Sequence, residues 1–394
     1  MAALLLAIIY LAFISLGLPD SLLGSAWPVM HVELGVQLSW MGIVTMIISC
    51  GTIVSSLASD FLTRKLGVGV VTAVSVLMTA GAMLGFSFAT KFWVLCIIAI
   101  PYGLGAGGVD AALNNYVALH YKSRHMSWLH CFWGIGTIVS PFVMGACLSG
   151  SAGWEGGYRI VSYVQIGLTV LLFCCLSLWK KPQGGNGAAK ALTLPQTFGL
   201  KGVIFLLIAF FCYCALESTM IHWTSSYLVE ARGSGAERAA SLASLFFIGM
   251  TAGRFISGFV TEKLGDKRLI RIGMGIIALG IVLLAVPFPS DVSVLVAFVV
   301  IGLGCAPVYP SIIHATPFNF GAENSQAVIG VEMAFAYLGS TFMPPLFGVI
   351  AQFISISFLP LWLACFLVLV VVMTELCNRA VEKKTGTKIE RIDF

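Results

Sequence analysis

Four acidic side chains lie inside long apolar runs of this sequence: Asp20, Asp110, Glu217 and Glu332. One basic side chain, Arg254, lies in another such run. Ionisable groups inside apolar runs of this kind are costly in a membrane, and they usually face a water-filled path where they bind substrates or carry ions. A carboxyl group can carry a proton, and its oxygens accept hydrogen bonds from hydroxyl groups. These residues therefore favour binding and ion coupling inside a membrane.

Amides and aromatic rings lie near these acids. In GGVDAALNNYV, Asn114 stands one helical turn after Asp110, and Asn115 follows directly. Carboxylate and amide oxygens bond to sugar hydroxyl groups, while Trp and Tyr rings cover the C–H face of a sugar. Sites for cations and drugs also combine an acid with aromatic rings, so that alternative stays open. The predicted substrate-binding residues are Trp27, Asp110, Asn114, Asn115, His130, Trp133, Tyr213, Glu217 and Tyr309.

We expect Asp20 and Asp110 to be the ion-coupling acids. Each acid has a structural alternative, in which its carboxyl group only bonds to the backbone or to a polar neighbour. For Arg254 and Glu332, which lie near the same ends of their runs, we favour an ion pair that acts in gating or structure. Packing of His130 in a polar pocket is an equal alternative to ligand contact.

The composition of the chain is that of a membrane protein. Hydrophobic residues make up 59% of the 394 residues and charged residues only 10%, where soluble domains have roughly 25% charged residues. The net charge of +5 is therefore no sign of nucleic-acid binding, and we predict no nucleic-acid partner. The 11 cysteines are scattered without a CxxC pair, which excludes a zinc or disulfide framework.

Eleven polar breaks divide the chain into twelve apolar runs, each long enough for a spanning helix. The longest break is rich in Gly and Lys and lies halfway along the chain. We predict an all-α membrane protein with two pseudo-symmetric bundles of six helices. The predicted parts are residues 1–180, a linker at 181–200, residues 201–378 and a tail at 379–394. Lys and Arg cluster in the even-numbered breaks and the tail, which predicts a multi-pass protein of the cell membrane with both termini cytoplasmic.

The two halves share a pattern. Gly-x4-Pro-x3-Gly occurs once in GIGTIVSPFVMG (134–145) and once in AYLGSTFMPPLFG (336–348). Glycine and proline in spanning helices usually serve close packing. Their recurrence in register favours a transporter built from two parallel repeats, with the substrate held between them.

The breaks SLASDFLTRKLG and GFVTEKLGDKR resemble the loop signature of the major facilitator superfamily, Gly-x3-Asp-Arg-x-Gly-Arg-Arg. Asp60 and Arg64 carry the resemblance in the first half, and Glu262 and Lys263 carry it in the second. Ser56, Phe61 and Thr63 depart from the signature. The resemblance implies the major facilitator fold, and for these residues it implies gating between states rather than substrate contact.

LPDSLL and GGVDAALNNYV are similar to the fucose–proton symporter branch of that superfamily. WLHCFWGIGTIVSP resembles the related sodium-dependent glucose transporters. The resemblance implies a secondary active transporter that moves a sugar or similar polar molecule together with a proton by alternating access. It also implies that Asp20 carries the proton, and that Asp110, with Asn114, anchors the sugar and can itself titrate. Sodium is the alternative coupling ion.

Two other functions stay open: a proton-coupled multidrug exporter, and a receptor or scaffold with the same fold. The sequence has no nucleophile–base pair, metal-ligand cluster or phosphate loop in a suitable context, so we predict that the protein is not an enzyme. We expect no cofactor, and a functional monomer in the lipid bilayer.

Overall fold

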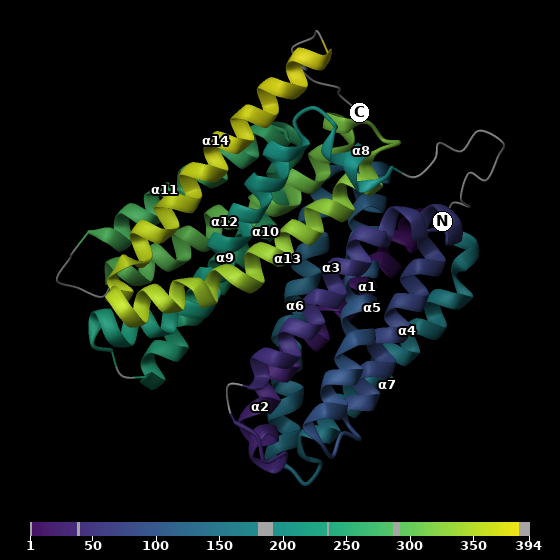
Figure 1. Cartoon of the computed structure of the whole chain (residues 1–394), viewed down its shortest axis with the longest axis vertical. Coiled ribbons are helices and arrows are strands. Elements are labelled where there is room, and N and C mark those ends of the chain that lie inside the picture. The colour runs from purple at the N-terminus through teal and green to yellow at the C-terminus, as the bar shows by residue number, and fades with distance from the viewer. Residues whose placement is uncertain (1, 38–39, 180–191, 235, 287–291, 386–394) are drawn as a thin grey trace. The chain divides into compact units, whose positions relative to one another are not determined.

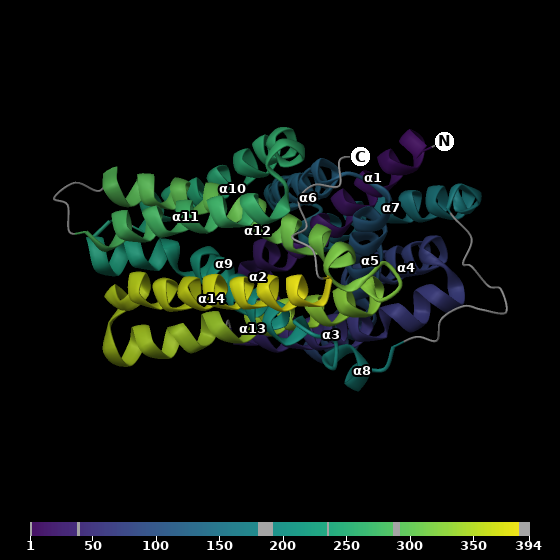
Figure 2. The same ribbon diagram turned by 90° about the horizontal axis from the view of Figure 1, so that it is seen from above.

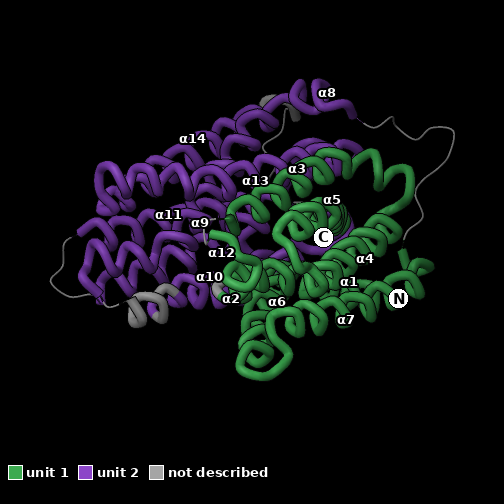
Figure 3. The backbone as a smooth tube through the Cα atoms, turned by 60° about the horizontal axis from the view of Figure 1, so that its bottom comes forward, with its two compact units in different colours: residues 1–116, 128–191 green, residues 117–127, 192–394 purple. Residues whose placement is uncertain are grey.

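The computed structural model describes residues 2–37, 40–179, 192–234, 236–286 and 292–385, and these residues form helices without a strand (Figure 1). The predicted linker and the predicted tail lie partly outside them. Contacts divide the chain into two units, which Figure 3 colours separately. Unit 1 contains residues 1–116 and 128–191, and unit 2 contains residues 117–127 and 192–394. The segment 117–127, which the sequence places in the first half, thus groups with unit 2.

Unit 1 contains seven α-helices within its described residues. They are α1 (Ala2–Asp20), α2 (Leu22–Glu33), α3 (Met41–Leu66), α4 (Val68–Phe86), α5 (Phe92–His120), α6 (Ser123–Ser149) and α7 (Gly153–Cys174), followed by the short 3-10 helix η2 (Leu176–Leu178). The last residues of α5 and the first of α6 belong to unit 2.

Unit 2 begins, after the gap in the described residues, with the short α8 (Leu194–Phe198). The long helices are α9 (Val203–Arg232), α10 (Ala236–Leu264), α11 (Asp266–Ala285), α12 (Val292–Phe320), α13 (Ser325–Ile350) and α14 (Leu359–Thr385). A π-helical turn, η3 (Ala351–Ser355), and a 3-10 turn, η4 (Ile356–Phe358), join α13 to α14. Within this unit α9 packs against α13 and α14, and α12 packs against α10 and α11 (Figures 1 and 2).

The number of spanning helices agrees with the prediction of twelve. Ten described segments are long and apolar enough to cross a membrane, and α3, which bends by 56°, makes an eleventh. One of the ten segments, Ser325–Glu382, contains both α13 and α14. These two helices have 26 and 27 residues, so each is long enough to span a bilayer by itself.

Glycines on α5 let three helices of unit 1 approach closely. A Cβ atom added to Gly103 would lie 2.2 Å from the Ile48 carbonyl oxygen of α3. On the other side of α5, a Cβ atom on Gly105 would lie 2.6 Å from the Ser75 carbonyl oxygen of α4. Only glycine fits at such distances, because the backbones themselves are in contact. The Gly-rich segment of α5 is therefore a packing surface.

The same backbone contacts recur in unit 2 and relate the two units position by position. A Cβ atom on Gly136 of α6 would lie 2.2 Å from the Ile14 oxygen of α1. A Cβ atom on Gly339 of α13 would lie 2.4 Å from the Phe211 oxygen of α9. Both glycines stand five residues before the proline of the repeated motif. The α1–α6 and α9–α13 pairs are therefore equivalent, with Ile14 matching Phe211.

A second pair of contacts extends this match. Gly103 meets the Ile48 oxygen on α3, and Gly302 of α12 meets the Phe246 oxygen on α10, with 2.2 Å from the added Cβ atom in both cases. The α3–α5 pair therefore matches α10–α12. The repeat predicted from the sequence is thus present as a repeat of helix contacts.

Candidate functional site

A helix break places Asp20 at the end of α1. Pro19 lies in the last turn of α1, and α2 begins only at Leu22. Proline removes a backbone donor and clashes with the preceding turn, so a break here is expected. The Ser21 hydroxyl group donates to the Thr137 carbonyl oxygen of α6 over 2.7 Å. The break is thus fixed by side-chain bonding to the neighbouring helix.

The break separates Asp20, the last residue of α1, from Trp27, a predicted substrate-binding residue of α2. Trp27 is only 2% exposed and lies on α2 in an apolar cluster, with its ring centroid 6.3 Å from that of Phe92. Its surroundings give no support to the predicted substrate contact.

The Asp20 carboxylate accepts two hydrogen bonds from side chains of unit 1. The Tyr102 hydroxyl group of α5 donates to Oδ1 over 3.1 Å, and the Trp133 indole N–H of α6 donates to Oδ2 over 2.9 Å. Asp20 is exposed, and no ion pair among the described residues includes it. The structure therefore places two of the predicted site residues, Asp20 and Trp133, in direct contact, and Tyr102 is a second partner of Asp20.

Asp110 and Asn114 form a second, separate polar group on α5. The Asn114 amide donates to Asp110 Oδ1 over 2.7 Å and to the Asp110 carbonyl oxygen over 3.0 Å. Both side chains are buried, and the Asn114 amide oxygen accepts no hydrogen bond within the described part of the chain. Asp110 follows Tyr102 by eight residues, which is about 12 Å along a helix. The structure thus does not bring Asp110 beside Asp20.

Two further predicted residues of unit 1 are buried. Asn115 is 5% exposed on α5. His130 is also 5% exposed, and its ring packs edge-on against Phe13 at a centroid distance of 5.5 Å.

In unit 2, Glu217 is held in an ion pair. Arg254 of α10 donates from Nη2 to Glu217 Oε1 of α9 over 3.2 Å, and both side chains are buried. The nearby Tyr213 hydroxyl group donates to the Cys305 carbonyl oxygen over 2.8 Å, and the Tyr309 ring lies 6.3 Å from the Tyr213 ring. Three of the predicted site residues, Glu217, Tyr213 and Tyr309, thus lie near one another in unit 2.

The predicted ion pair between Arg254 and Glu332 is wrong. Arg254 pairs with Glu217 instead, and Glu332 is fully buried on α13. The Thr316 hydroxyl group of α12 lies 3.0 Å from both oxygens of Glu332. The error arose because similar depth along two helices does not fix which faces of the helices meet.

The predicted gating residues have different partners in the two units. Arg64 Nε donates to Asp60 Oδ1 over 2.8 Å, one turn apart on α3. Glu262 of α10 pairs with Arg124 over 3.2 Å and with Lys122 over 3.8 Å, rather than with its neighbour Lys263. The bases bound to Glu262 come from the segment 117–127, which the sequence analysis did not connect to it.

The turns that follow α3 and α10 fix the true register of the two loop motifs. Gly67 and Gly265 end these helices with φ values of 86° and 73°, a region that favours glycine. Counting back three residues from each glycine places Arg64 opposite Glu262. The first-half acid, Asp60, is therefore not the equivalent of Glu262.

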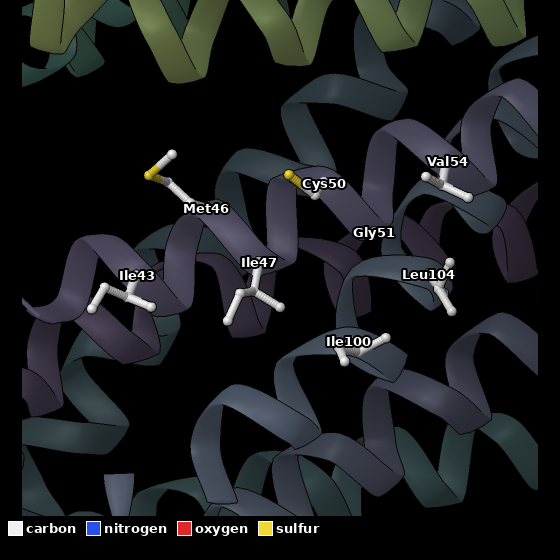
Figure 4. Close-up of a pocket in the computed structure, with 8 residues that line it drawn as sticks. All are labelled: Ile43, Met46, Ile47, Cys50, Gly51, Val54, Ile100 and Leu104. Atoms are coloured by element: carbon white, nitrogen blue, oxygen red, sulfur yellow. The ribbon is translucent and has the colours of Figure 1, made fainter. Parts of the chain in front are cut away.

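An apolar cleft of about 540 Å³ lies along α3 and α5 of unit 1 (Figure 4). Its lining offers carbon and sulfur atoms and no side chain suited to bind hydroxyl groups. The cleft is therefore unsuited to a polar substrate. Its lining residues are Ile43, Met46, Ile47, Cys50, Gly51, Val54, Ile100 and Leu104.

Tyr102 is the partner of Asp20 that sequence reasoning missed. It stands in the segment IPYGLG, one residue before the packing glycine Gly103. A glycine that brings α5 close to its neighbours also fixes the position of the side chain beside it. A tyrosine next to such a glycine is therefore a sequence signal for a hydrogen bond to a neighbouring helix. Only the fold shows that this face of α5 meets the end of α1.

Comparison with known proteins identifies the family signature. The signature described as Major Facilitator Superfamily matches residues 9–242 and 206–390. The chain is 24% identical over 363 residues to an uncharacterized MFS-type transporter of Yersinia pestis, covering 88% of this chain and 89% of that protein. It is 27% identical over 285 residues to a hexuronate transporter of Bacillus subtilis, covering 66% of this chain and 65% of that protein. The solved structure of the E. coli fucose:proton symporter FucP matches with a TM-score of 0.76 and 17% identity, over 95% of this chain and 98% of that chain.

Proposed function

Because the chain belongs to the major facilitator superfamily, it is a membrane transporter and not an enzyme, and we propose that it couples the uptake of a sugar to that of a proton by alternating access. The observation that carries this proposal is the exposed Asp20 carboxylate, which accepts two hydrogen bonds and forms no ion pair within the described part of the chain. The hexuronate transporter and the fucose:proton symporter, which this chain resembles, support a sugar by their names.

The two donors on Asp20 differ in what they can do when the acid takes up a proton. The Trp133 indole can only donate, whereas the Tyr102 hydroxyl group can also accept. A proton on Oδ1 therefore faces Tyr102, which turns its own hydrogen away and accepts from the acid. Trp133 keeps its bond to Oδ2. Asp20 can thus load a proton without leaving either partner unbonded.

Protonation of Asp20 also changes what the site offers to a sugar. The Tyr102 hydroxyl hydrogen, released from Oδ1, becomes free to donate to a sugar hydroxyl group. The Trp133 ring offers an apolar face next to it. Proton loading and sugar binding are then linked through one tyrosine, which is the property that a symporter needs.

Asp110 and Asn114 provide the second part of the proposed sugar site. The Asn114 amide oxygen accepts no hydrogen bond from the described residues, so it can accept one from a sugar hydroxyl group. Because both residues are buried, sugar contact requires the helices around α5 to move, as alternating access does. Asp110 can also titrate in this cycle.

The proposed orientation follows from the distribution of Lys and Arg. We expect the protein in the cell membrane with both termini cytoplasmic, because the basic residues gather in the even-numbered connections and the tail. We expect the monomer to transport, since Asp20, Tyr102, Trp133, Asp110 and Asn114 all lie in unit 1 of a single chain.

Uptake into proteoliposomes tests the proposed function. A panel of radiolabelled neutral hexoses and hexuronates is offered with an inward proton gradient, with an inward sodium gradient, or with neither. We expect one sugar class to accumulate only with the proton gradient and to be lost with a protonophore. If a sodium gradient alone drives accumulation, the coupling ion is sodium rather than a proton. If no sugar moves while an apolar cationic drug is extruded, the sugar proposal is wrong.

A further inference from the structure

The α5–α6 connection, by which we mean residues 117–127 with the adjoining ends of both helices, is held by a polar network within unit 2. Glu262 of α10 binds Lys122 and Arg124 of this connection. Asp266, the first residue of α11, accepts a hydrogen bond of 2.5 Å from the Ser123 hydroxyl group. Three helices of unit 2 thus hold residues 117–127, and the third of them, α12, does so through a histidine.

His314 of α12 bonds through both of its ring nitrogens. Nδ1 lies 2.7 Å from Asp266 Oδ2, and Nε2 lies 3.3 Å from the Tyr121 carbonyl oxygen. The side chain is 9% exposed, so water replaces neither partner easily. One imidazole therefore bridges α11 and the α5–α6 connection.

The two partners of His314 require two donors. A carboxylate and a carbonyl oxygen can only accept, and a neutral imidazole has a single N–H. In either neutral tautomer one ring nitrogen would direct its lone pair at an oxygen. The arrangement is satisfied only by the imidazolium ion, which donates on both sides.

The charged groups around His314 divide into those that titrate near neutral pH and those that do not. Asp266 from α11 and Glu262 from α10 are acids, and Lys122 and Arg124 from the connection are bases. An imidazole is the one side chain whose ordinary titration falls between pH 5 and 8. His125 in the connection is also an imidazole and lies 3.3 Å from Arg124 Nε, so it serves as the control.

We propose that His314 is a pH-sensitive latch that binds the α5–α6 connection to α11 and α12 within unit 2. At acidic pH the imidazolium ion holds both Asp266 and the Tyr121 carbonyl oxygen. At alkaline pH the ring loses a proton and one of the two bonds, and the connection loosens. Since this connection is expected on the cytoplasmic side, acid in the cytoplasm would slow the helix movements of transport and so limit further proton entry.

Hydrogen–deuterium exchange of peptides covering residues 117–127 tests the latch in lipid nanodiscs, without any substrate. After correction for the intrinsic pH dependence of exchange, we expect the wild-type connection to exchange at least about tenfold faster at pH 8 than at pH 5.5, the size of one lost charged hydrogen bond. The exchange measurement does not depend on which sugar is carried. The latch can therefore be disproved while the proposed transport holds, and the proposed transport can be disproved while the latch holds.

Two substitutions of His314 separate titration from packing. His314→Phe should give fast exchange at both pH values, and His314→Arg, which keeps two donors and its charge, should give slow exchange at both. His125→Asn should behave like the wild type. Wild-type exchange that does not change with pH, or a pH dependence that survives in the folded His314→Arg variant, would overturn the latch.

Discussion

Asp20 and Glu217 occupy equivalent positions in the two units, and the chain gives them different partners. Each lies six residues after the carbonyl group that contacts the glycine of the repeated motif. Glu217 is neutralised by Arg254, whereas Asp20 has hydrogen-bond donors and no ion pair among the described residues. The position equivalent to Arg254, counted from the matching α3 and α10 contacts, is Ser56. Unit 2 has a base, Arg254, that pairs with its acid, and unit 1 has Ser56 at the equivalent position. The acid of unit 1, Asp20, is therefore left to hydrogen-bond donors.

This asymmetry predicts that the Glu217–Arg254 pair matters for stability more than for coupling. Arg254→Met should destabilise the protein by about 3–5 kcal/mol, because it leaves a buried carboxylate without its partner. The double variant Glu217→Gln with Arg254→Met should recover most of that loss. Thermal unfolding in detergent checks both. A double variant as unstable as the single one would show that Arg254 acts through other contacts.

The bond from Tyr102 to Asp20 should be needed for proton-driven uptake. Tyr102→Phe removes a hydrogen bond to a charged group, worth about 1.5–3 kcal/mol, and should slow uptake about tenfold or more. Tyr158→Phe is the matched control, because the Tyr158 hydroxyl group is buried in the same unit and has no hydrogen-bond partner among the residues that the structure describes. Initial uptake rates compare the two. Equal rates would remove Tyr102 from the proposed cycle.

Close packing of α1 on α6 should be needed to hold Asp20 in place. Gly136→Ala would set a Cβ atom 2.2 Å from the Ile14 oxygen, so the helices must separate, and we expect a loss of about 2 kcal/mol or more together with a loss of transport. Gly145→Ala lies on the same helix with no atom within 4 Å of its added Cβ and should be tolerated. Unfolding and uptake measured on both variants decide this. Equal tolerance of the two changes would contradict the packing role.

Asp60 should control the change between states rather than sugar affinity. Asp60→Asn weakens the bond to Arg64 at the end of α3 and leaves the Asp20 region unchanged. We expect sugar binding in detergent close to that of the wild type and slower transport, since the partly buried pair is a contact within α3 and includes no residue of the Asp20 region. Loss of binding in this variant would mean that Asp60 belongs to the sugar site.

The sequence predicted the twelve helices and their repeat because apolar length and glycine spacing are local properties of the chain. It did not predict that the first apolar run divides after Asp20, so that Trp27 lies on a second helix, α2. Partners across helices were harder still. Arg254 was matched to Glu332 by depth alone, although the faces of α9 and α10 bring it to Glu217. Tyr102 and His314 act through contacts between segments far apart in sequence, which no local pattern encodes.

The most direct measurement compares sugar exchange with sugar accumulation in the Asp20→Asn variant. The amide mimics the protonated acid and cannot release a proton, so labelled sugar should exchange across the membrane in counterflow at nearly the wild-type rate. Accumulation against a sugar gradient under an imposed proton gradient should be lost. The double variant Glu217→Gln with Arg254→Met, which removes the whole ion pair at the equivalent position of the other unit, is the control and should still accumulate sugar. If Asp20→Asn accumulates sugar to the wild-type level, Asp20 does not carry the proton.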